Sequence, residues 1–222
     1  MQRRITTNRS CDDLNHRMLN AGTAGALLLP VASRNDVPAA YRTTAIADLL
    51  AYHNGFGEAP SSYTHPAVLV GMCMDHRKKL RIPDKFAYVM RAAGANFTGM
   101  EFQMSFAIAV GGVRAVAIIG HDQCGMSGLA ARKDAFVANL VGDAGWNRDA
   151  AVQHFDQYAT RFEIGDPAEF TRAQVRLLRS HYPKLTIAPL LYRLGDGLLH
   201  VIDETGELVH ANASDLQTRT AS

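Results

Sequence analysis

The stretch AVLVGMCMDHR, Ala67 to Arg77, decides the fold class of this chain. Its first part, Ala67 to Met72, is apolar and lacks the polar/apolar alternation of a strand with one solvated face. A second run of the same kind spans Ala115 to Gly120. Uninterrupted apolar runs of strand length are typical of parallel strands that are covered on both faces. We therefore expect an α/β fold, in which helices flank a mostly parallel central sheet.

The size and composition indicate one globular domain. The chain has 222 residues, 47% of them hydrophobic and 20% charged, and a formal net charge of +2. We expect an N-terminal helical arm and loop over residues 1–66 and a core with C-terminal helices and a hairpin over residues 67–222. The near-neutral charge and the scattered arginines do not indicate a nucleic-acid partner, and no apolar run is long enough to span a membrane. Three cysteines are too few for a disulfide framework and suggest reduced thiols in the cytoplasm.

The N-terminus loosely resembles a signal peptide, because basic residues precede an Ala/Gly/Leu-rich run from Ala21 to Ala32. Asp12 and Asp13 interrupt the basic part, and glycines dilute the apolar part. We therefore expect the protein to stay in the cytoplasm. The third thiol, Cys11, lies in this region and has no partner motif.

The segments around the two apolar runs predict a helix from Thr43 or Thr44 to Tyr52 and a strand from Phe86 to Met90 that is closed by Arg91 to Gly94. From Thr98 to Val110 the spacing is helical, and apolar residues lie on two faces of the helix. A helix of that kind is usually buried on both sides. We expect the sheet on one side and a second subunit on the other.

The C-terminal third predicts three further elements. Asn147 can cap a helix whose inner side carries Val152, Phe155, Tyr158 and Phe162. Asp166 followed by Pro167 is a strong helix start. The segment from Thr186 to Val209 indicates a strand and a hairpin.

Both apolar runs end in polar residues that suit a metal site. The first ends in Cys73, Asp75 and Arg77, and the second in His121 and Cys124. Ligands of open α/β sheets bind beyond the carboxyl ends of the strands, and catalytic Zn²⁺ typically takes three Cys, His or carboxylate ligands and keeps one position open. Cys73, His121 and Cys124 form such a set. Asp75, held by Arg77, would orient a water whose pKa the metal lowers.

Taken singly, these residues are weak signals. A lone cysteine at a strand end is usually a small buried hydrophobe, and Asp75 with Arg77 is most often a surface ion pair. The combination at one end of the sheet favours the metal site. The other histidines lack ligand-like spacing and are expected at the surface or in the core: His16, His53, His65, His154, His181, His200 and His210.

These residues resemble the motifs of the β-class carbonic anhydrases. Cys73-Met74-Asp75-His76-Arg77 is similar to the family's Cys-x-Asp-x-Arg motif, and Gly120 to Gly125 is similar to its Gly-His-x-x-Cys-Gly motif. Arg91 to Gly94 resembles the Arg-Asn-x-Gly segment between them. Two residues depart from the pattern. His76 replaces a small residue and is either a proton shuttle or an outward-facing side chain, and Ala92 replaces the usual Asn. The chain thus resembles a divergent branch.

The resemblance implies a function, a cofactor and an assembly. It implies that Cys73, His121 and Cys124 bind Zn²⁺ and that zinc-bound hydroxide hydrates carbon dioxide reversibly to bicarbonate. The Asp75–Arg77 dyad would orient the zinc-bound water, or Asp75 would occupy the fourth position in a closed resting form. The smallest unit would be a homodimer, alone or as a dimer of dimers.

Three alternatives remain open. The same zinc set could hydrolyse carbonyl sulfide or carbon disulfide, as superfamily members do. The chain could be a non-catalytic bicarbonate-binding homologue, although the intact dyad argues against it. Metal-free catalysis by Cys124, as in a rhodanese or a phosphatase, is disfavoured because Arg132 is too far along the chain to serve an anion-binding loop.

Overall fold

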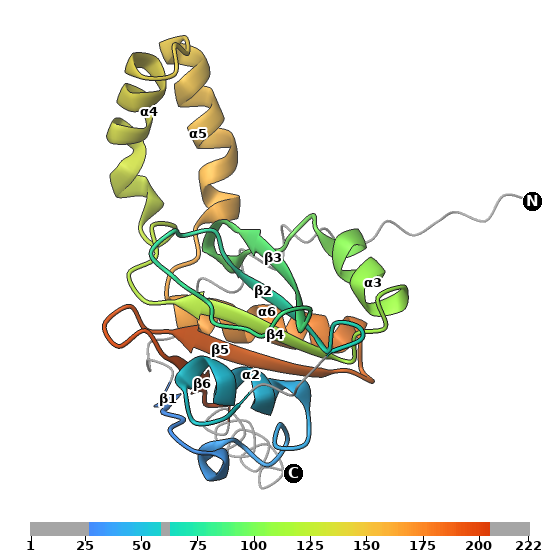
Figure 1. Cartoon of the computed structure of the whole chain (residues 1–222). Coiled ribbons are helices and arrows are strands. Elements are labelled where there is room, and N and C mark those ends of the chain that lie inside the picture. Colours follow the sequence, from blue (N-terminus) through green and yellow to red (C-terminus); the bar gives the residue numbers. More distant parts are fainter. Residues whose placement is uncertain (1–26, 59–62, 205–222) are drawn as a thin grey trace, which may run out of the picture.

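The computed structural model describes residues 27–58 and 63–204, and its centre is a six-stranded sheet in the order β1-β6-β5-β4-β2-β3 (Figure 1). The strands are β1 (Leu28–Leu29), β2 (Val68–Cys73), β3 (Ala87–Ala92), β4 (Ala115–His121), β5 (Thr186–Tyr192) and β6 (Leu199–Ile202). The helices are α2 (Ala45–Asn54), α3 (Glu101–Ala109), α4 (Lys133–Gly142), α5 (Arg148–Phe162) and α6 (Pro167–His181), with short 3₁₀ turns at Arg34–Asp36, Ala93–Ala95 and Leu129–Arg132.

The sheet is mostly parallel, which confirms the expected α/β fold. Strands β3, β2, β4 and β5 run parallel, whereas β6 and β1 are added antiparallel at one edge. Every residue of β2 and β4 is buried. Because side chains alternate between the two faces of a strand, full burial requires cover on both faces, as the uninterrupted apolar runs predicted.

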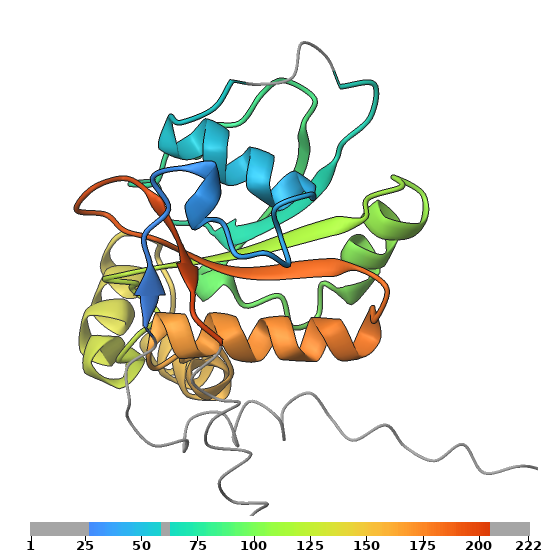
Figure 2. The same cartoon turned by 90° about the horizontal axis from the view of Figure 1, so that it is seen from below.

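Two helical layers provide that cover (Figure 2). Val68 and Val70 of β2 belong to a core that includes Leu50 of α2. Leu69, which points the opposite way, belongs to a second core with Met104 of α3 and Val175 of α6. The central strands are therefore fixed from both sides.

Two glycines let the layer that contains Phe97 and α6 approach β2 and β4 closely near the carboxyl ends of these strands. A side chain at Gly71 would come within 2.7 Å of the ring of Phe97, and one at Gly120 would collide with Thr171 of α6. This close packing fixes the backbone immediately before Cys73 and His121.

The predicted helix caps are confirmed, and two predictions need correction. Asn147 and Asp166 accept backbone N–H groups at the starts of α5 and α6. Strand β3 does not close at Met90 but continues to Ala92, because pairing with β2 continues to Cys73. Tyr158, expected on the inner side of its helix, is 36% exposed, because α4 and α5 form a hairpin that projects from the body (Figure 1).

Residues before the first long strand share the main core. The sequence did not predict β1, which pairs with β6, and Val31, Tyr41 and Leu49 are buried in the same core as β2. The division at residue 66 stays a prediction. Cys11, the Ala21–Ala32 run up to residue 26 and the end of the C-terminal hairpin lie outside the described residues. In the part that the structure describes, no helix has the length and apolar character needed to cross a bilayer.

Candidate metal centre

The carboxyl ends of β2 and β4 bring three donor side chains together. The two strands are parallel neighbours, with Met72 opposite Ile119, so Cys73 and His121 lie at the same edge of the sheet. The turn after His121 includes Gln123 with a positive φ of 53° and returns the chain to Cys124. The sulfur atoms of both cysteines and a ring nitrogen of His121 all lie within 4.8 Å of one another, and all three residues are buried.

His121 presents a free ring nitrogen to this cluster. Its Nδ1 lies 2.7 Å from the carbonyl oxygen of Asp122. A carbonyl oxygen only accepts, so Nδ1 carries the proton and Nε2 keeps its lone pair. The Nε2 atom is buried and has no hydrogen-bond partner among the described residues. An orphaned buried nitrogen is costly, and a metal ligand is the role that would satisfy it.

The two thiols interact directly and are not joined by a disulfide. Their mutual hydrogen bond lowers the pKa of Cys73 and raises the pKa of Cys124, so one sulfur holds the proton that the other accepts. Two ligands of one Zn²⁺ lie about 2.0–2.3 Å from it, and hence at most about 4.6 Å from each other. The cluster is close to that size, so its residues fit a metal ion and can bind one.

Asp75 and Arg77 form a bidentate pair beside the cluster. Arg77 Nη2 donates to Asp75 Oδ2 at 2.6 Å, and Arg77 Nε donates to Oδ1 at 3.0 Å. These hydrogen bonds from Arg77 hold the pKa of Asp75 well below its ordinary value. The same carboxylate oxygen, Oδ2, lies 3.8 Å from His121 Nε2. Arg77 also donates to the carbonyl oxygen of Gln123 at 3.0 Å, so it links the ends of both strands.

Sequence reasoning missed two residues of this site. The side chain of Lys78 is buried, and its Nζ atom has no hydrogen-bond partner among the described residues. Asp122 supports the cluster twice, since its backbone carbonyl fixes His121 and its Oδ1 accepts the backbone N–H of Leu194 at 2.8 Å. Lys78 lies in a run of basic residues, and Asp122 occupies a variable position of the second motif, so the sequence contained no signal for either role. His76, the possible proton shuttle, is exposed.

The loop after Cys124 is fixed by the segment between α5 and α6. Glu163 accepts the backbone N–H groups of Gly128 at 3.0 Å and Leu129 at 2.6 Å. Ser127 Oγ donates to the carbonyl oxygen of Gly165 at 2.7 Å. These bonds anchor the chain just beyond Cys124, and they involve residues that are distant in sequence.

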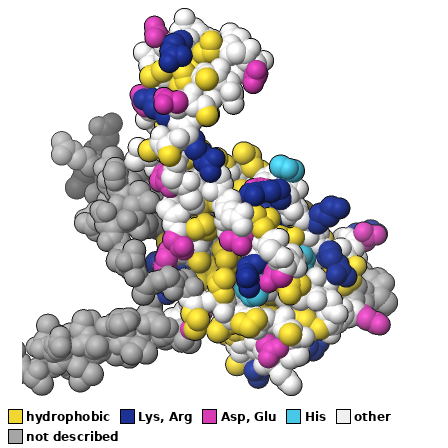
Figure 3. Space-filling view, turned by 90° about the vertical axis from the view of Figure 1, so that its left-hand side faces the viewer, with side chains coloured by type: hydrophobic (Ala, Val, Ile, Leu, Met, Phe, Trp, Pro, Cys, Tyr) yellow, Lys and Arg dark blue, Asp and Glu magenta, His cyan; other side chains and the backbone are white. Residues whose placement is uncertain are grey.

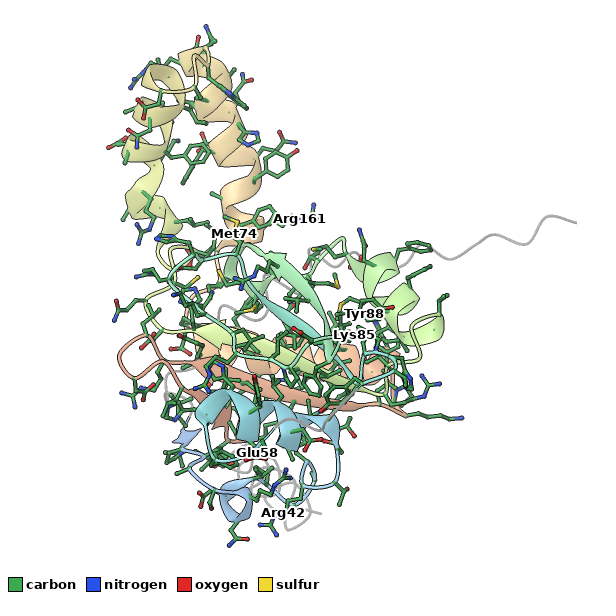
Figure 4. All side chains as sticks on the ribbon, in the orientation of Figure 1. Arg42, Glu58, Met74, Lys85, Tyr88 and Arg161 are labelled. Atoms are coloured by element: carbon green, nitrogen blue, oxygen red, sulfur yellow. The ribbon has the colours of Figure 1, made fainter. Side chains whose placement is uncertain are left out.

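The surface at this end of the sheet is rich in charge. Figure 3 views the molecule from the side on which the strands end, with the α4–α5 hairpin above, and Lys and Arg side chains gather there beside His and acidic ones. In Figure 4, Met74 and Arg161 lie at the foot of the hairpin. Met74 is 60% exposed although it follows Cys73 directly, so the buried cluster lies close to the surface.

Comparison with known proteins shows similarity in structure only. No family model matches the chain, and no curated protein matches it. The β-carbonic anhydrase isoform I of Trichomonas vaginalis superimposes with a TM-score of 0.51 at 21% identity, over 66% of this chain and 88% of that one. The carbonic anhydrase of Streptococcus mutans gives 0.50 at 20% identity, over 71% and 95%. The apo form of a carbon disulfide hydrolase gives 0.49 at 18% identity, over 63% and 80%. The match to the Trichomonas vaginalis enzyme shows that this chain has the β-carbonic anhydrase fold.

Proposed function

We propose that this chain is a divergent β-class carbonic anhydrase, which hydrates carbon dioxide reversibly to bicarbonate with Zn²⁺ as its cofactor. One observation carries the proposal. Two thiols and an imidazole nitrogen converge at the carboxyl ends of β2 and β4, the edge at which α/β proteins bind ligands, and that nitrogen has no hydrogen-bond partner among the residues that the structure describes.

The donor set favours zinc over harder cations. Thiolate sulfur and imidazole nitrogen suit Zn²⁺, whereas Mg²⁺ and Ca²⁺ take oxygen ligands. We assign Cys73, His121 and Cys124 as the ligands. Three protein ligands leave one position for solvent or substrate, as in catalytic sites. The bound metal would supply Lewis acidity, which lowers the pKa of water and makes a nucleophile available at neutral pH.

Asp75 and Arg77 would direct proton positions at that nucleophile. The Arg77 pair keeps Asp75 ionised, so its carboxylate can only accept hydrogen bonds. Because Oδ2 lies only 3.8 Å from His121 Nε2, the carboxylate would stand beside a water at the open position. It would accept a hydrogen bond from that water and so turn a lone pair of the water oxygen toward carbon dioxide. The bidentate bond from Arg77 fixes this orientation.

We further propose a cytoplasmic homodimer. The two buried, unbridged thiols suit a reducing compartment. Phe102, Phe106 and Val110 on α3 are 78%, 51% and 69% exposed. An apolar surface of this kind marks a protein interface, and a second copy would cover it.

Metal analysis combined with gas turnover tests the function. The purified protein is expected to contain one zinc per chain and to accelerate carbon dioxide hydration in a stopped-flow assay. Carbonyl sulfide and carbon disulfide are assayed in parallel. Faster turnover of either would reassign the substrate, and zinc-loaded protein without any turnover between pH 7 and 9 would indicate a non-catalytic homologue. Protein that binds no zinc refutes the proposal.

A further inference from the structure

Lys78 is a buried cation that the mechanism above does not use. Its side chain is 3% exposed, and its Nζ atom lacks a hydrogen-bond partner among the described residues. The charges that act on it are those of Cys73, Asp75 and Cys124, so the ammonium lies beside the metal centre. A buried ammonium needs opposite charge beside it, and here the cysteine sulfurs and the Asp75 carboxylate provide that charge.

The chain holds Lys78 in place from both sides. Arg77 is fixed by Asp75 through the bidentate pair. Three residues beyond Lys78, the backbone N–H of Arg81 donates to Nδ1 of the buried His53 at 3.0 Å, and Nε2 of His53 donates to the carbonyl oxygen of Gly197 at 3.0 Å. The segment that bears Lys78 is thus tied to α2 and to the β5–β6 turn, and its ammonium is preorganised.

Counting charges shows what Lys78 changes. The centre contains two cysteine sulfurs, the Asp75 carboxylate and the Arg77 guanidinium. With both thiols ionised and a divalent cation bound, these groups are neutral overall. Lys78 adds one positive charge, which a single monovalent anion at the open position would neutralise. In a buried site, such a match has a large effect on anion affinity, because the interior screens charge poorly.

We propose that Lys78 is an anion-binding residue of this metal centre, which holds a small monovalent oxyanion of the bicarbonate class against the metal. This inference rests on the proposed function, in which bicarbonate is the product. The Lys78 ammonium would bind the anion directly, whereas the Nε and Nη2 atoms of Arg77 are already engaged by Asp75 and Gln123.

The test measures anion binding without turnover. Protein loaded with Co²⁺ in place of Zn²⁺ is titrated with bicarbonate and with thiocyanate, and the visible absorption of the cobalt ion reports the dissociation constants. We expect Lys78→Met to weaken both anions by about 10-fold or more and Lys78→Arg to restore much of the affinity. Lys79→Met is the matched control, because Lys79 is the exposed neighbour, and it should leave both constants within about twofold.

Stability does not confound the comparison. Lys78→Met replaces a buried cation whose Nζ atom lacks a hydrogen-bond partner among the described residues with an apolar side chain of similar length, so that no large cavity is left. Thermal melting checks this, and Lys78→Gln serves as the second neutral variant if Lys78→Met fails to fold.

The possible outcomes separate this inference from the proposed function. Unchanged anion constants in a folded neutral variant overturn the role of Lys78, even if the protein hydrates carbon dioxide. Anion binding that depends on Lys78 in a protein without turnover supports the inference and refutes the function. A chain that takes up neither cobalt nor zinc overturns both.

Discussion

The carboxyl end of the central strands and the β3–α3 edge of the sheet are both incomplete, but in opposite ways. At the strand ends, two buried polar atoms have no hydrogen-bond partner within the described part of the chain, namely Nε2 of His121 and Nζ of Lys78. At the β3–α3 edge, apolar side chains face solvent. They include Tyr88, which packs against Gly111 at the end of α3 (Figure 4), and Phe102, which is 78% exposed.

The contrast indicates what each region binds. A buried polar atom is satisfied by an ion or a polar ligand, whereas an exposed apolar surface is satisfied by another apolar surface. The opposite edge of the sheet shows a completed version of the same architecture, because β6 is buried at every position and paired on both sides. We therefore expect the first region to bind a metal ion and the second to bind another protein surface.

The largest expected effect comes from removing a ligand. Cys124→Ala should abolish stoichiometric zinc and reduce carbon dioxide hydration to the buffer rate, because two remaining ligands do not make a site of the kind proteins use for zinc. Metal analysis of the purified variant measures this. Cys11→Ala is the thiol control and should keep one zinc per chain. Full zinc retention in Cys124→Ala would refute the ligand role of Cys124.

A smaller effect is expected from the carboxylate beside the ligands. Asp75→Asn should keep zinc but slow hydration by roughly 10- to 100-fold, because the amide replaces an accepting oxygen with a donor next to the reacting water. Stopped-flow rates at equal zinc content measure the change. Asp84→Asn, at an exposed position three residues before the start of β3, should leave the rate unchanged. Equal rates in the two variants would show that the dyad mechanism is wrong.

The β3–α3 edge is tested by adding a charge to it. Phe106→Glu should weaken the proposed dimer by at least about 30-fold, because assembly would bury an unpaired carboxylate. Sedimentation velocity over a concentration series measures the dissociation. Phe136→Glu places the same change on the α4–α5 hairpin, where Phe136 is 37% exposed, and should leave the dimer intact. If only the Phe136 variant dissociated, the dimer interface would have to be assigned to the hairpin instead.

The smallest effect concerns the loop after Cys124. Partial burial raises the pKa of Glu163, but backbone N–H donors from Gly165, Leu129 and Gly128 outweigh it and leave the pKa below its ordinary value. The stabilisation is therefore complete above the ordinary glutamate pKa of about 4.3 and is lost as the pH falls through the lower folded value. Glu163→Gln should lower Tm by about 2–4 °C at pH 7.

The way in which this Tm difference changes with pH tests the same assignment. The difference in Tm between the parent and Glu163→Gln should shrink as the pH falls below about 4 and disappear once the carboxylate of the folded protein is protonated, because both side chains are then uncharged. Differential scanning calorimetry at several pH values measures it. Glu58→Gln, at an exposed position, should show no difference at any pH. A Tm difference that grows in acid would contradict the assignment.

The predictable parts of the molecule were those encoded in short stretches. The ends of β2 and β4 were located within one residue, because burial on both faces removes polar residues from a strand and the polar residues resume where it ends. Helix caps such as Asp166 accept hydrogen bonds from N–H groups two and three residues further on, so they too can be predicted from the local sequence.

The unpredicted parts depend on distant contacts. Burial of Lys78 follows from the way the segment after β2 docks on His53, and the role of Glu163 follows from its approach to the Cys124 loop. Phe102 and Phe106 have the helical spacing of a buried helix, and only the position of α3 at the sheet edge leaves them exposed. Spacing alone cannot distinguish a core helix from one that awaits a partner.

The strand order also has a consequence for how the protein matures. Cys73 and His121 belong to parallel strands that pair in register, and parallel neighbours must be joined by long crossovers, which makes their pairing slow. The three donor atoms converge only after β4 has docked beside β2. We therefore expect the proposed zinc ion to load only after these two strands have paired, so that zinc uptake by a newly synthesised chain would report the docking of β4 beside β2.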